Sequence, residues 1–489
     1  MLKTPRKAFA IRFICFLSLT LLLCGCGIAE DPTNPIGMIV SSFKATAEPA
    51  GVDEITTALE EQAATGTVTA GEGESVTATP DPTEAAEFAE TAVSIAAEAV
   101  EIAEEAAAEE ATPTPTIQEL EIWIPPQFDP AQDTPAGRAL QDAVNKYMEQ
   151  YPDVHITLTV KATTGDASVL NTLTAANNAA KSVLPSLVLL SRSDMESAVQ
   201  RGLLQQITTS LFNDTSSWYS YARQAAVVDN NVYGIPVLGD AIVLVYRTAK
   251  LGADADVSSW SSVLTHGLPI GFAPASSSSM FGAFIYLNAG GKMTNDQGQP
   301  YLDQTKLVDT LNFFVTGGQN GAFPPSIAQL LDQTQVWQRF MDGTLSIIIS
   351  PYSSYSHYRT QEMSFAALPT QEEPIDYPMV SSWNLVMTEQ NTAKQGAAVA
   401  FAEYMAGELV NDEFSMRAGY LPVRTAGHTV WETSAEYETV SAIAEKASLV
   451  PNNQVSNKLL PVINNAILQV IKNALTPEAA AEEAAASFN

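Results

Sequence analysis

The sequence contains few cysteines, histidines and basic residues, and each shortage excludes a class of function. Only three of the 489 residues are cysteines, all within the first 26, so no disulfide framework and no cysteine-ligated zinc site can form later in the chain. The four histidines are separated widely in the sequence, at His155, His266, His357 and His428. With 24 Lys and Arg against 55 Asp and Glu, the net charge of −31 argues strongly against a nucleic-acid partner.

Sequence motifs of catalysis and internal repeats are also absent. There is no G-x-S-x-G, no H-E-x-x-H and no Walker-type phosphate loop. Carboxylates are so numerous that any two of them could in principle act as the acid and base of a glycoside hydrolase. A lipoprotein enzyme of that kind therefore remains an alternative. A structural or adhesive surface protein is a second alternative, although it would favour repeats.

Hydrophobic residues make up 46% of the chain and charged residues 16%, which is enough apolar material for a large core. The charge, however, divides the chain into three segments. Residues 1–26 carry four bases and no acid, residues 27–117 carry 19 acids and one base, and residues 118–489 carry 36 acids and 19 bases. We therefore interpret these segments separately.

The first segment has the pattern of a signal peptide. Basic residues between Lys3 and Arg12 precede an uncharged run over residues 13–23, which is too short to span a bilayer. The run ends in Leu23-Cys24-Gly25-Cys26, which resembles the bacterial lipoprotein signal. The resemblance implies that Cys26 is diacylated and becomes the N-terminus, on the outer face of the cytoplasmic membrane. An uncleaved anchor helix and an ordinary secretory signal are the alternatives.

The second segment, residues 27–117, is rich in Ala, Glu, Thr and Pro. Low apolar content with charge of one sign predicts an acidic tether that is largely disordered or forms a solvated stalk helix. Within it, Phe88, Ile95 and Ile102 are spaced by seven residues, a faint heptad pattern. We favour a lone stalk, and hence a monomer, over an oligomerising coiled coil.

The third segment alternates strands with helices. The patterns predict strands over 120–124, 154–160 and 187–190, and helices over 134–151, 169–181 and 195–201. This order predicts an α/β fold with a parallel sheet and right-handed crossovers. Because ligands bind outside the carboxyl ends of strands in such sheets, the loops over 125–128 and 191–194 are candidate ligand sites.

Short motifs in this segment resemble those of the extracellular solute-binding proteins of bacterial ABC importers, the group that includes maltodextrin-binding protein. The matching pieces, in order, are Glu121-Ile122-Trp123, Leu140 to Pro152, Pro185 to Val188, Gly202 to Ile207, Val232 to Pro236, Leu244 to Arg247, Trp260, Phe340 to Leu345, Gly419 to Arg424 and Leu475 to Ala480. Two positions depart from the family pattern, with Ser186 in place of Asp and Arg247 in place of Asn. The resemblance covers nearly all of residues 118–489.

The resemblance implies a two-lobed α/β fold of the periplasmic-binding-protein type, with the ligand in the cleft between the lobes. Lobe one would comprise about residues 118–240 and 382–428, and lobe two about residues 241–381 and 429–489. Hinge motion would close the cleft on the ligand, and the closed form would dock on the permease subunits of an ABC transporter. The resemblance implies a binding protein rather than an enzyme, with no cofactor and no metal.

The candidate ligand is a small solute, and a neutral carbohydrate fits best. A sugar needs an aromatic ring against its C–H face and planar polar groups for its hydroxyls, and the few basic residues near the candidate cleft argue against an anion. The candidate ligand-binding residues are Asp240, Tyr352, Trp383, Arg192, Asp194 and Ser278. Asp240 and Tyr352 stand at positions where relatives resembling maltodextrin-binding protein place a binding acid and a stacking aromatic.

The other four candidates come from the expected loops and hinges. Arg192 and Asp194 follow the strand over 187–190, Trp383 lies at the second expected hinge, and Ser278 belongs to the serine run over 276–279. Each candidate also has a structural interpretation. Tyr352 could be core and Trp383 hinge packing; Asp240 could be a helix cap and the serine run a plain loop or N-cap.

Overall fold

The computed structural model describes residues 117–252, 255–370 and 377–488. The expected signal peptide, Cys26 and nearly all of the expected tether lie outside the described residues. The described residues belong to one compact unit. No helix in the described ranges is long and apolar enough to cross a membrane.

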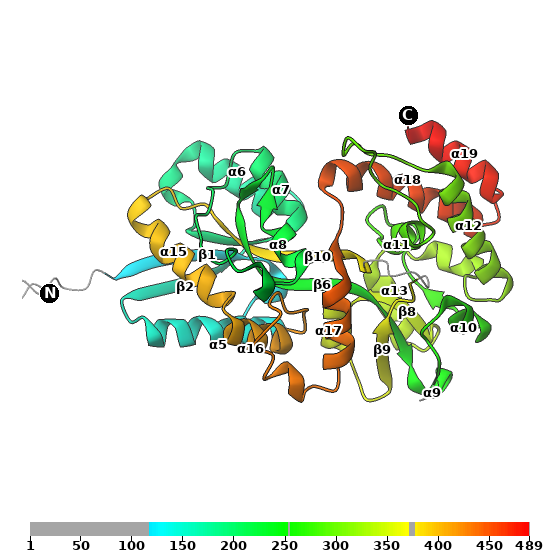
Figure 1. The fold of residues 1–489 in the computed structure, drawn as a ribbon, viewed down its shortest axis with the longest axis horizontal. Coiled ribbons are helices and arrows are strands. Elements are labelled where there is room, and N and C mark those ends of the chain that lie inside the picture. Colours follow the sequence, from blue (N-terminus) through cyan, green and yellow to red (C-terminus); the bar gives the residue numbers. More distant parts are fainter. Residues whose placement is uncertain (1–116, 253–254, 371–376, 489) are drawn as a thin grey trace, which may run out of the picture. The chain divides into compact units, whose positions relative to one another are not determined.

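Strands β10 and β6 lie at the centre of a mixed sheet with the order β2-β1-β3-β10-β6-β8-β7 (Figure 1). Strand β11 pairs with β10, and β9 pairs with β6. The strands are β1 Gln118–Ile124, β2 Val154–Val160, β3 Leu187–Ser191, β4 Val227–Val228, β5 Asn231–Val232, β6 Gly234–Arg247, β7 Ile270–Gly271, β8 Ile347–Pro351, β9 Met363–Ala367, β10 Tyr377–Met387 and β11 Ala447–Leu449.

Helices surround both halves of this sheet. We call the half of the sheet that contains β2, β1 and β3, with its helices, lobe one; these helices are α5 Pro135–Gln150, α6 Val169–Ala179, α7 Arg192–Gln200, α8 Ser220–Ala225, α15 Thr392–Met405 and α16 Glu408–Ala418. We call the half that contains β8, β7 and β9, with its helices, lobe two; these helices are α9 Thr248–Leu251, α10 Trp260–Thr265, α11 Phe281–Asn288, α12 Gln304–Gln319, α13 Gln333–Met341, α14 Tyr352–Tyr358, α17 Tyr437–Lys446, α18 Asn453–Ile471 and α19 Pro477–Phe488. Short 3-10 turns are η1 Pro126–Phe128, η2 Lys181–Val183, η3 Thr215–Ser217, η4 Pro325–Gln329 and η5 Trp431–Thr433.

Lobe one is built on the parallel strands β2, β1 and β3. Because successive side chains of a strand point to opposite faces, Ile122 and Ile124 of β1 pack with α5, whereas Trp123 packs with residues of α6 and α7. Figure 1 shows α6 and α7 on one side of these strands and α5 and α16 on the other. Strand β3 is apolar on both faces because helices cover both.

Strand β6 passes from one half of the sheet to the other. Its residues 234–241 pair with β10, and its residues 242–247 pair with β8 and β9. Every residue of β6 except Asp240 and Arg247 is buried, which explains its almost continuously apolar sequence. The partner change between Ala241 and Ile242 makes this strand a direct connection between the two lobes.

Lobe two packs its helices around an aromatic cluster. Phe272, Phe281, Phe314 and Phe323 have ring centroids 4.9–6.3 Å apart, with edge and tilted geometries. Helix α18 is the longest described helix, with 19 residues, and packs against α11, α12 and α19. It therefore forms much of the frame of this lobe.

The structure confirms the expected α/β class and the six expected elements, with one correction. Helix α7 begins at Arg192, not near Met195, so residues 192–194 form a first helical turn in place of the expected loop. The cause is local: the Ser191 hydroxyl oxygen accepts a hydrogen bond from the Asp194 N–H at 3.1 Å, which caps the helix. The expected loop over 125–128 contains the turn η1.

Candidate functional site

The carboxyl ends of the parallel strands define two candidate ligand-binding edges, one in each lobe. In lobe one, β1 leads into η1 and β3 leads into α7. In lobe two, β7 leads into the serine run and β8 leads into α14, and these two strands are also parallel. Such edges are where open α/β sheets bind ligands, because loops rather than ladder partners occupy them.

Asp240 lies on β6 at the passage between the lobes and is partly buried. Its carboxylate accepts hydrogen bonds from Ser353 of α14, from the N–H at 3.1 Å and from the hydroxyl at 2.6 Å. Burial raises the pKa of Asp240 to about 6, although the Ser353 hydrogen bonds lower it. The carboxylate thus joins a lobe-one strand to the first turn of a lobe-two helix.

Tyr352 lies beside Ser353 but points into the protein. Its side chain is only 1% exposed, its ring packs against Tyr355 and Phe365, and its hydroxyl donates to Glu436 at 2.6 Å. Burial and the neighbouring Glu436 carboxylate raise the pKa of Tyr352 well above its usual value. In this conformation the ring presents no face to a ligand, so the stacking role predicted from sequence would require a rearrangement.

Trp383 lies on β10, where its backbone pairs with Ser191 at the carboxyl end of β3. The indole is partly exposed and meets Phe128 of η1 edge-on, with ring centroids 5.4 Å apart. Phe128 in turn stacks on Tyr420 at 5.6 Å. Trp383 is thus the outer member of an aromatic row at the lobe-one edge.

Tyr420 lies near Asp240, because the next residue, Leu421, exchanges backbone hydrogen bonds with Gly239 at 2.9 and 2.7 Å. Burial raises the pKa of Tyr420 above its usual range, and the Asp240 charge adds to the effect. The same carboxylate contributes to the raised pKa of Tyr221. Trp383, Phe128 and Tyr420 thus form an aromatic row, and Asp240 lies near its Tyr420 end; we refer to these four residues as the group at the passage between the lobes.

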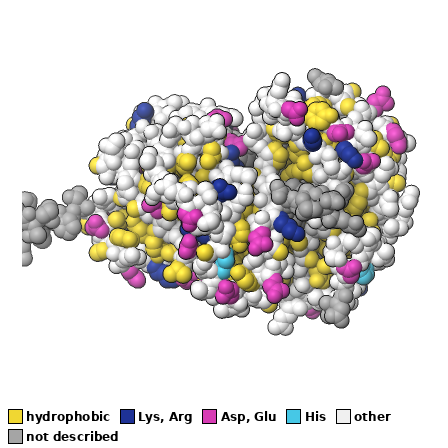
Figure 2. Space-filling view, in the orientation of Figure 1, with side chains coloured by type: hydrophobic (Ala, Val, Ile, Leu, Met, Phe, Trp, Pro, Cys, Tyr) yellow, Lys and Arg dark blue, Asp and Glu magenta, His cyan; other side chains and the backbone are white. Residues whose placement is uncertain are grey.

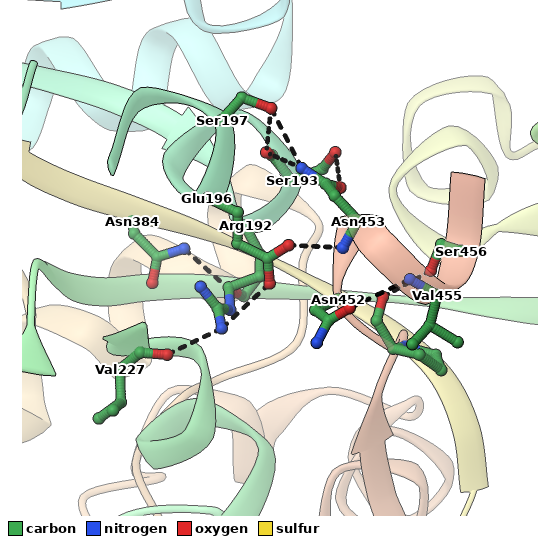
Figure 3. Close-up of polar contacts among 12 residues, drawn as sticks. Arg192, Ser193, Glu196, Ser197, Val227, Asn384, Asn452, Asn453, Val455 and Ser456 are labelled. Atoms are coloured by element: carbon green, nitrogen blue, oxygen red, sulfur yellow. Dashed lines mark hydrogen bonds and ion pairs between the residues drawn. The ribbon is translucent and has the colours of Figure 1, made fainter. Parts of the chain in front are cut away.

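Arg192 is held within the protein rather than extended toward solvent (Figure 3). Its Nη2 donates to the Val227 carbonyl oxygen at 2.8 Å and lies 3.1 Å from Glu196 Oε1. Its Nη1 is buried and has no hydrogen-bond partner among the described residues. Burial lowers the pKa of Arg192, and Glu196 opposes that effect.

Asp194 and Ser278 are placed by short-range contacts. Asp194 accepts a hydrogen bond from the Ser191 hydroxyl at 2.9 Å, and burial raises its pKa. Ser278 is exposed, and its hydroxyl lies 3.1 Å from that of Ser276. Both residues follow carboxyl strand ends, Asp194 after β3 and Ser278 after β7.

The sequence-predicted residues therefore fall into three groups. Asp240 and Trp383 belong to the group at the passage, Arg192 and Asp194 lie on the first turn of α7, and Ser278 lies at the lobe-two edge. Sequence reasoning missed Ser353 and Tyr420. Ser353 immediately follows Tyr352, and Tyr420 stands inside the Gly419 to Arg424 motif, so both were adjacent to recognised signals.

Charge and metal-binding groups are sparse around these edges. On the face in Figure 2, basic and acidic side chains are intermixed and no basic patch is visible. Within the described ranges, no group of three or more His, Cys, Asp or Glu side chains could hold a metal ion. The arrangement offers carboxylate, hydroxyl and aromatic surfaces, which suit an uncharged polar molecule.

Solved structures with the same fold include several sugar-binding proteins. The GacH receptor of Streptomyces glaucescens, solved unliganded and with acarbose, is 14% identical, with a TM-score of 0.58 over 76% of this chain and 97% of that chain. Maltose-bound MalE3 of T. maritima is 14% identical, with a TM-score of 0.60 over 76% and 98%. Maltose-bound MalE of Listeria monocytogenes is 15% identical, with a TM-score of 0.60 over 76% and 97%. These likenesses show the two-lobed fold.

Sequence comparison identifies the family. None of the curated proteins matches this chain significantly. The model of one family, described as bacterial extracellular solute-binding protein, matches residues 142–441, which is more than half of the chain. The protein therefore belongs to the bacterial extracellular solute-binding proteins, a family of binding proteins rather than enzymes.

Proposed function

We propose that the protein captures a neutral carbohydrate between its lobes and delivers it to the permease of an ABC importer. The observation that carries the proposal is the position of Asp240: this partly buried residue lies where β6 passes between the lobes, and its carboxylate accepts two hydrogen bonds from Ser353 of lobe two, at 3.1 and 2.6 Å. A carboxylate with remaining acceptor capacity can take hydrogen bonds from sugar hydroxyls.

The aromatic row supports a sugar over other uncharged solutes. Trp383 is partly exposed beside the buried Phe128, so its ring can lie against the C–H face of a sugar. Structures of similar fold are described with maltose, maltotetraose and tagatose bound. Ser278 and Asp194 would supply hydroxyl and carboxylate groups from the edges of lobe two and lobe one.

The sequence suggests how the lobes, the tether and the lipid would be arranged at the membrane. Lobe one would comprise residues 118–240 and 382–428, and lobe two residues 241–381 and 429–489. Cys26 would carry the lipid, and residues 27–117 would tether the lobes to the outer face of the cytoplasmic membrane. An acidic tether extends by self-repulsion, which gives the lobes reach to a separate permease.

A thermal-shift screen tests the proposal. The probe protein is the mature chain from residue 26 with Cys26→Ser, and the panel contains maltose, maltotetraose, tagatose, amino acids and phosphate. A sugar present at 100 times its dissociation constant should stabilise the protein by about 2.7 kcal/mol. Stabilisation by amino acids or phosphate, with no response to any sugar, would contradict the carbohydrate assignment.

A further inference from the structure

A side chain of α18 is hydrogen-bonded to the serine run, residues 276–279, between β7 and α11. The Asn464 Nδ2 group donates to the Ser276 carbonyl oxygen at 3.0 Å and to the Ser279 carbonyl oxygen at 2.9 Å. These two carbonyls flank Ser277 and Ser278, which are exposed. One amide group therefore holds both ends of the segment whose tip presents its hydroxyls to solvent.

Asn464 itself has little freedom to move. It is 2% exposed, and its Oδ1 atom is buried with no hydrogen-bond partner in the described part of the chain. A Cβ atom at Gly282 of α11 would lie 2.8 Å from that Oδ1, so α11 and α18 approach closely here. Because the Asn464 Oδ1 atom has no partner, the side chain makes its hydrogen bonds through the two N–H groups of Nδ2 alone.

The first turn of the same helix is attached to lobe one (Figure 3). Glu196 of α7, 5% exposed, accepts a hydrogen bond from the Asn453 N–H at 2.6 Å. The Asn453 side chain donates to the Ser193 carbonyl oxygen at 2.7 Å and to the Ser197 hydroxyl at 3.1 Å, and accepts from the Ser193 hydroxyl at 2.6 Å. Four hydrogen bonds thus fix α18 to the helix that starts at the lobe-one edge.

Both attachments lie on one continuous helix. Asn453 and Asn464 are 11 residues apart in α18, which corresponds to about 16 Å along the helix axis. Pro461 lies between them and removes one helical hydrogen bond, which permits bending but leaves the rise per residue unchanged. The spacing between the α7 attachment and the serine run is therefore set by the length of this helix.

We propose that Asn464 and Asn453 are positioning residues for the ligand: Asn464 shapes the serine run, and Asn453 fixes α18, and with it the serine run, relative to the lobe-one edge. The ligand part of this inference rests on the proposed function, because the serine run is a candidate sugar contact. The positioning part does not, since it concerns the ligand-free protein.

The first test needs no ligand. Asn464→Asp keeps the side-chain shape but replaces the two donors by a carboxylate facing two carbonyl oxygens. The amides of Ser278 and Ser279 donate to the Ser276 hydroxyl and carbonyl oxygens, and their hydrogen exchange should become at least about tenfold faster, the change expected when two such hydrogen bonds are lost. The exposed neighbour Asn465→Asp is the matched control and should leave this exchange unchanged. Unchanged exchange in a folded Asn464→Asp protein would overturn the proposal.

A second variant guards against misfolding. Asn464→Ala removes the donors without adding charge, and it should also accelerate exchange of the Ser278 and Ser279 amides. If both Asn464 variants fail to fold, the residue is part of the core and the positioning role is wrong.

Asn453→Ala should accelerate the exchange of the same amides, although Asn453 lies 11 residues from Asn464, whereas the exposed Asn457→Ala should not. Faster exchange in α7 alone, with unchanged exchange in the serine run, would show that α18 does not couple the two attachments.

The last test measures affinity, with maltose as the probe. Titration calorimetry should give a dissociation constant about tenfold higher for Asn464→Asp than for the parent and Asn465→Asp. Equal affinities with a loosened serine run would show that this segment does not position the sugar. If the parent binds neither maltose nor another sugar of the panel, the proposed function fails, while the exchange experiment still decides whether Asn464 shapes the serine run.

Discussion

At the scale of single residues, the protonation of Asp240 links the passage between the lobes to pH. Burial raises its pKa to about 6 in the folded protein, against about 3.9 in an unfolded chain. Between pH 4 and 6 the folded state therefore binds more protons than the unfolded state, and the free energy of unfolding falls as pH rises. The contribution is complete below pH 4 and is lost above about pH 6.

Replacing Asp240 by Asn should remove this pH dependence. The amide keeps an acceptor for the Ser353 N–H and no longer places a charge in a partly buried position. At pH 7 the variant should be more stable than the parent by about 1–3 kcal/mol, and the difference should vanish near pH 4. Urea unfolding of both proteins at pH 4, 5, 6 and 7 provides the measurement. Parallel curves at every pH would show that Asp240 does not titrate in this range.

Tyr352 should matter for stability as well as for any ligand. Because its ring is buried against Phe365 and its hydroxyl bonds Glu436, Tyr352→Ala should lower the free energy of unfolding by about 3–5 kcal/mol. Tyr352→Phe keeps the packing and should lose about 1.5–3 kcal/mol, the range for a hydrogen bond to a charged group. Chemical denaturation checks both values. A Tyr352→Ala protein of parental stability would indicate that the ring leaves the core in solution.

At the scale of elements, β6 is tightly packed at Gly239, just before it passes from lobe one to lobe two. Gly239 exchanges two backbone hydrogen bonds with Leu421, at 2.9 and 2.7 Å. A Cβ atom at Gly239 would overlap the hydroxyl of Tyr221, which donates to the Pro422 carbonyl oxygen at 2.6 Å. The strand therefore requires a residue without a side chain immediately before Asp240.

Gly239→Ala should force Tyr221 to move and break its hydrogen bond to Pro422. Overpacking of this kind lowers the free energy of unfolding by about 1–3 kcal/mol. The double variant Gly239→Ala with Tyr221→Ala removes both the hydroxyl and the ring carbons that the new Cβ atom would overlap, so it should lose less than the sum of the two single changes. Thermal and chemical unfolding of the three variants gives the comparison. Strict additivity would mean that the strand shifts and that Tyr221 does not limit it.

The elements could be predicted from sequence because their causes are local. The apolar run over 187–190 and the periodicity over 134–151 reproduce β3 and α5 to within a residue or two. Contacts of the candidate site could not be predicted in the same way. Tyr352 meets Glu436 across 84 residues and Glu196 meets Asn453 across 257, and no short-range pattern encodes such pairs. The start of α7 was missed although Ser191 is a strong N-cap residue.

At the scale of the whole molecule, two strands and one helix connect the two lobes. Strands β6 and β10 connect the two halves of one sheet, while α18 carries hydrogen bonds to α7 at its start and packs within lobe two along its length. A hinge motion of the lobes must therefore bend β6 and β10, and it must either keep or break the hydrogen bonds between α18 and α7. A ligand that contacts the edges of both lobes would favour the closed arrangement over the open one. The shift in free energy equals the difference between its binding free energies to the two arrangements.

We propose that Cys26 attaches the protein to the membrane, because Leu23 to Cys26 resembles the bacterial lipoprotein signal. Each buried methylene of an acyl chain contributes about 0.8 kcal/mol, and two chains together give stable anchoring. Cys26→Ser should therefore move the protein from the membrane fraction to the soluble fraction. Cys24→Ser, two residues away, leaves the acylated position intact and should stay with the membranes. Ultracentrifugation and blotting of both variants separate the outcomes. Sedimentation of Cys26→Ser with the membranes would argue for an uncleaved anchor helix. Release of Cys24→Ser but not of Cys26→Ser would show that Cys24, and not Cys26, carries the lipid.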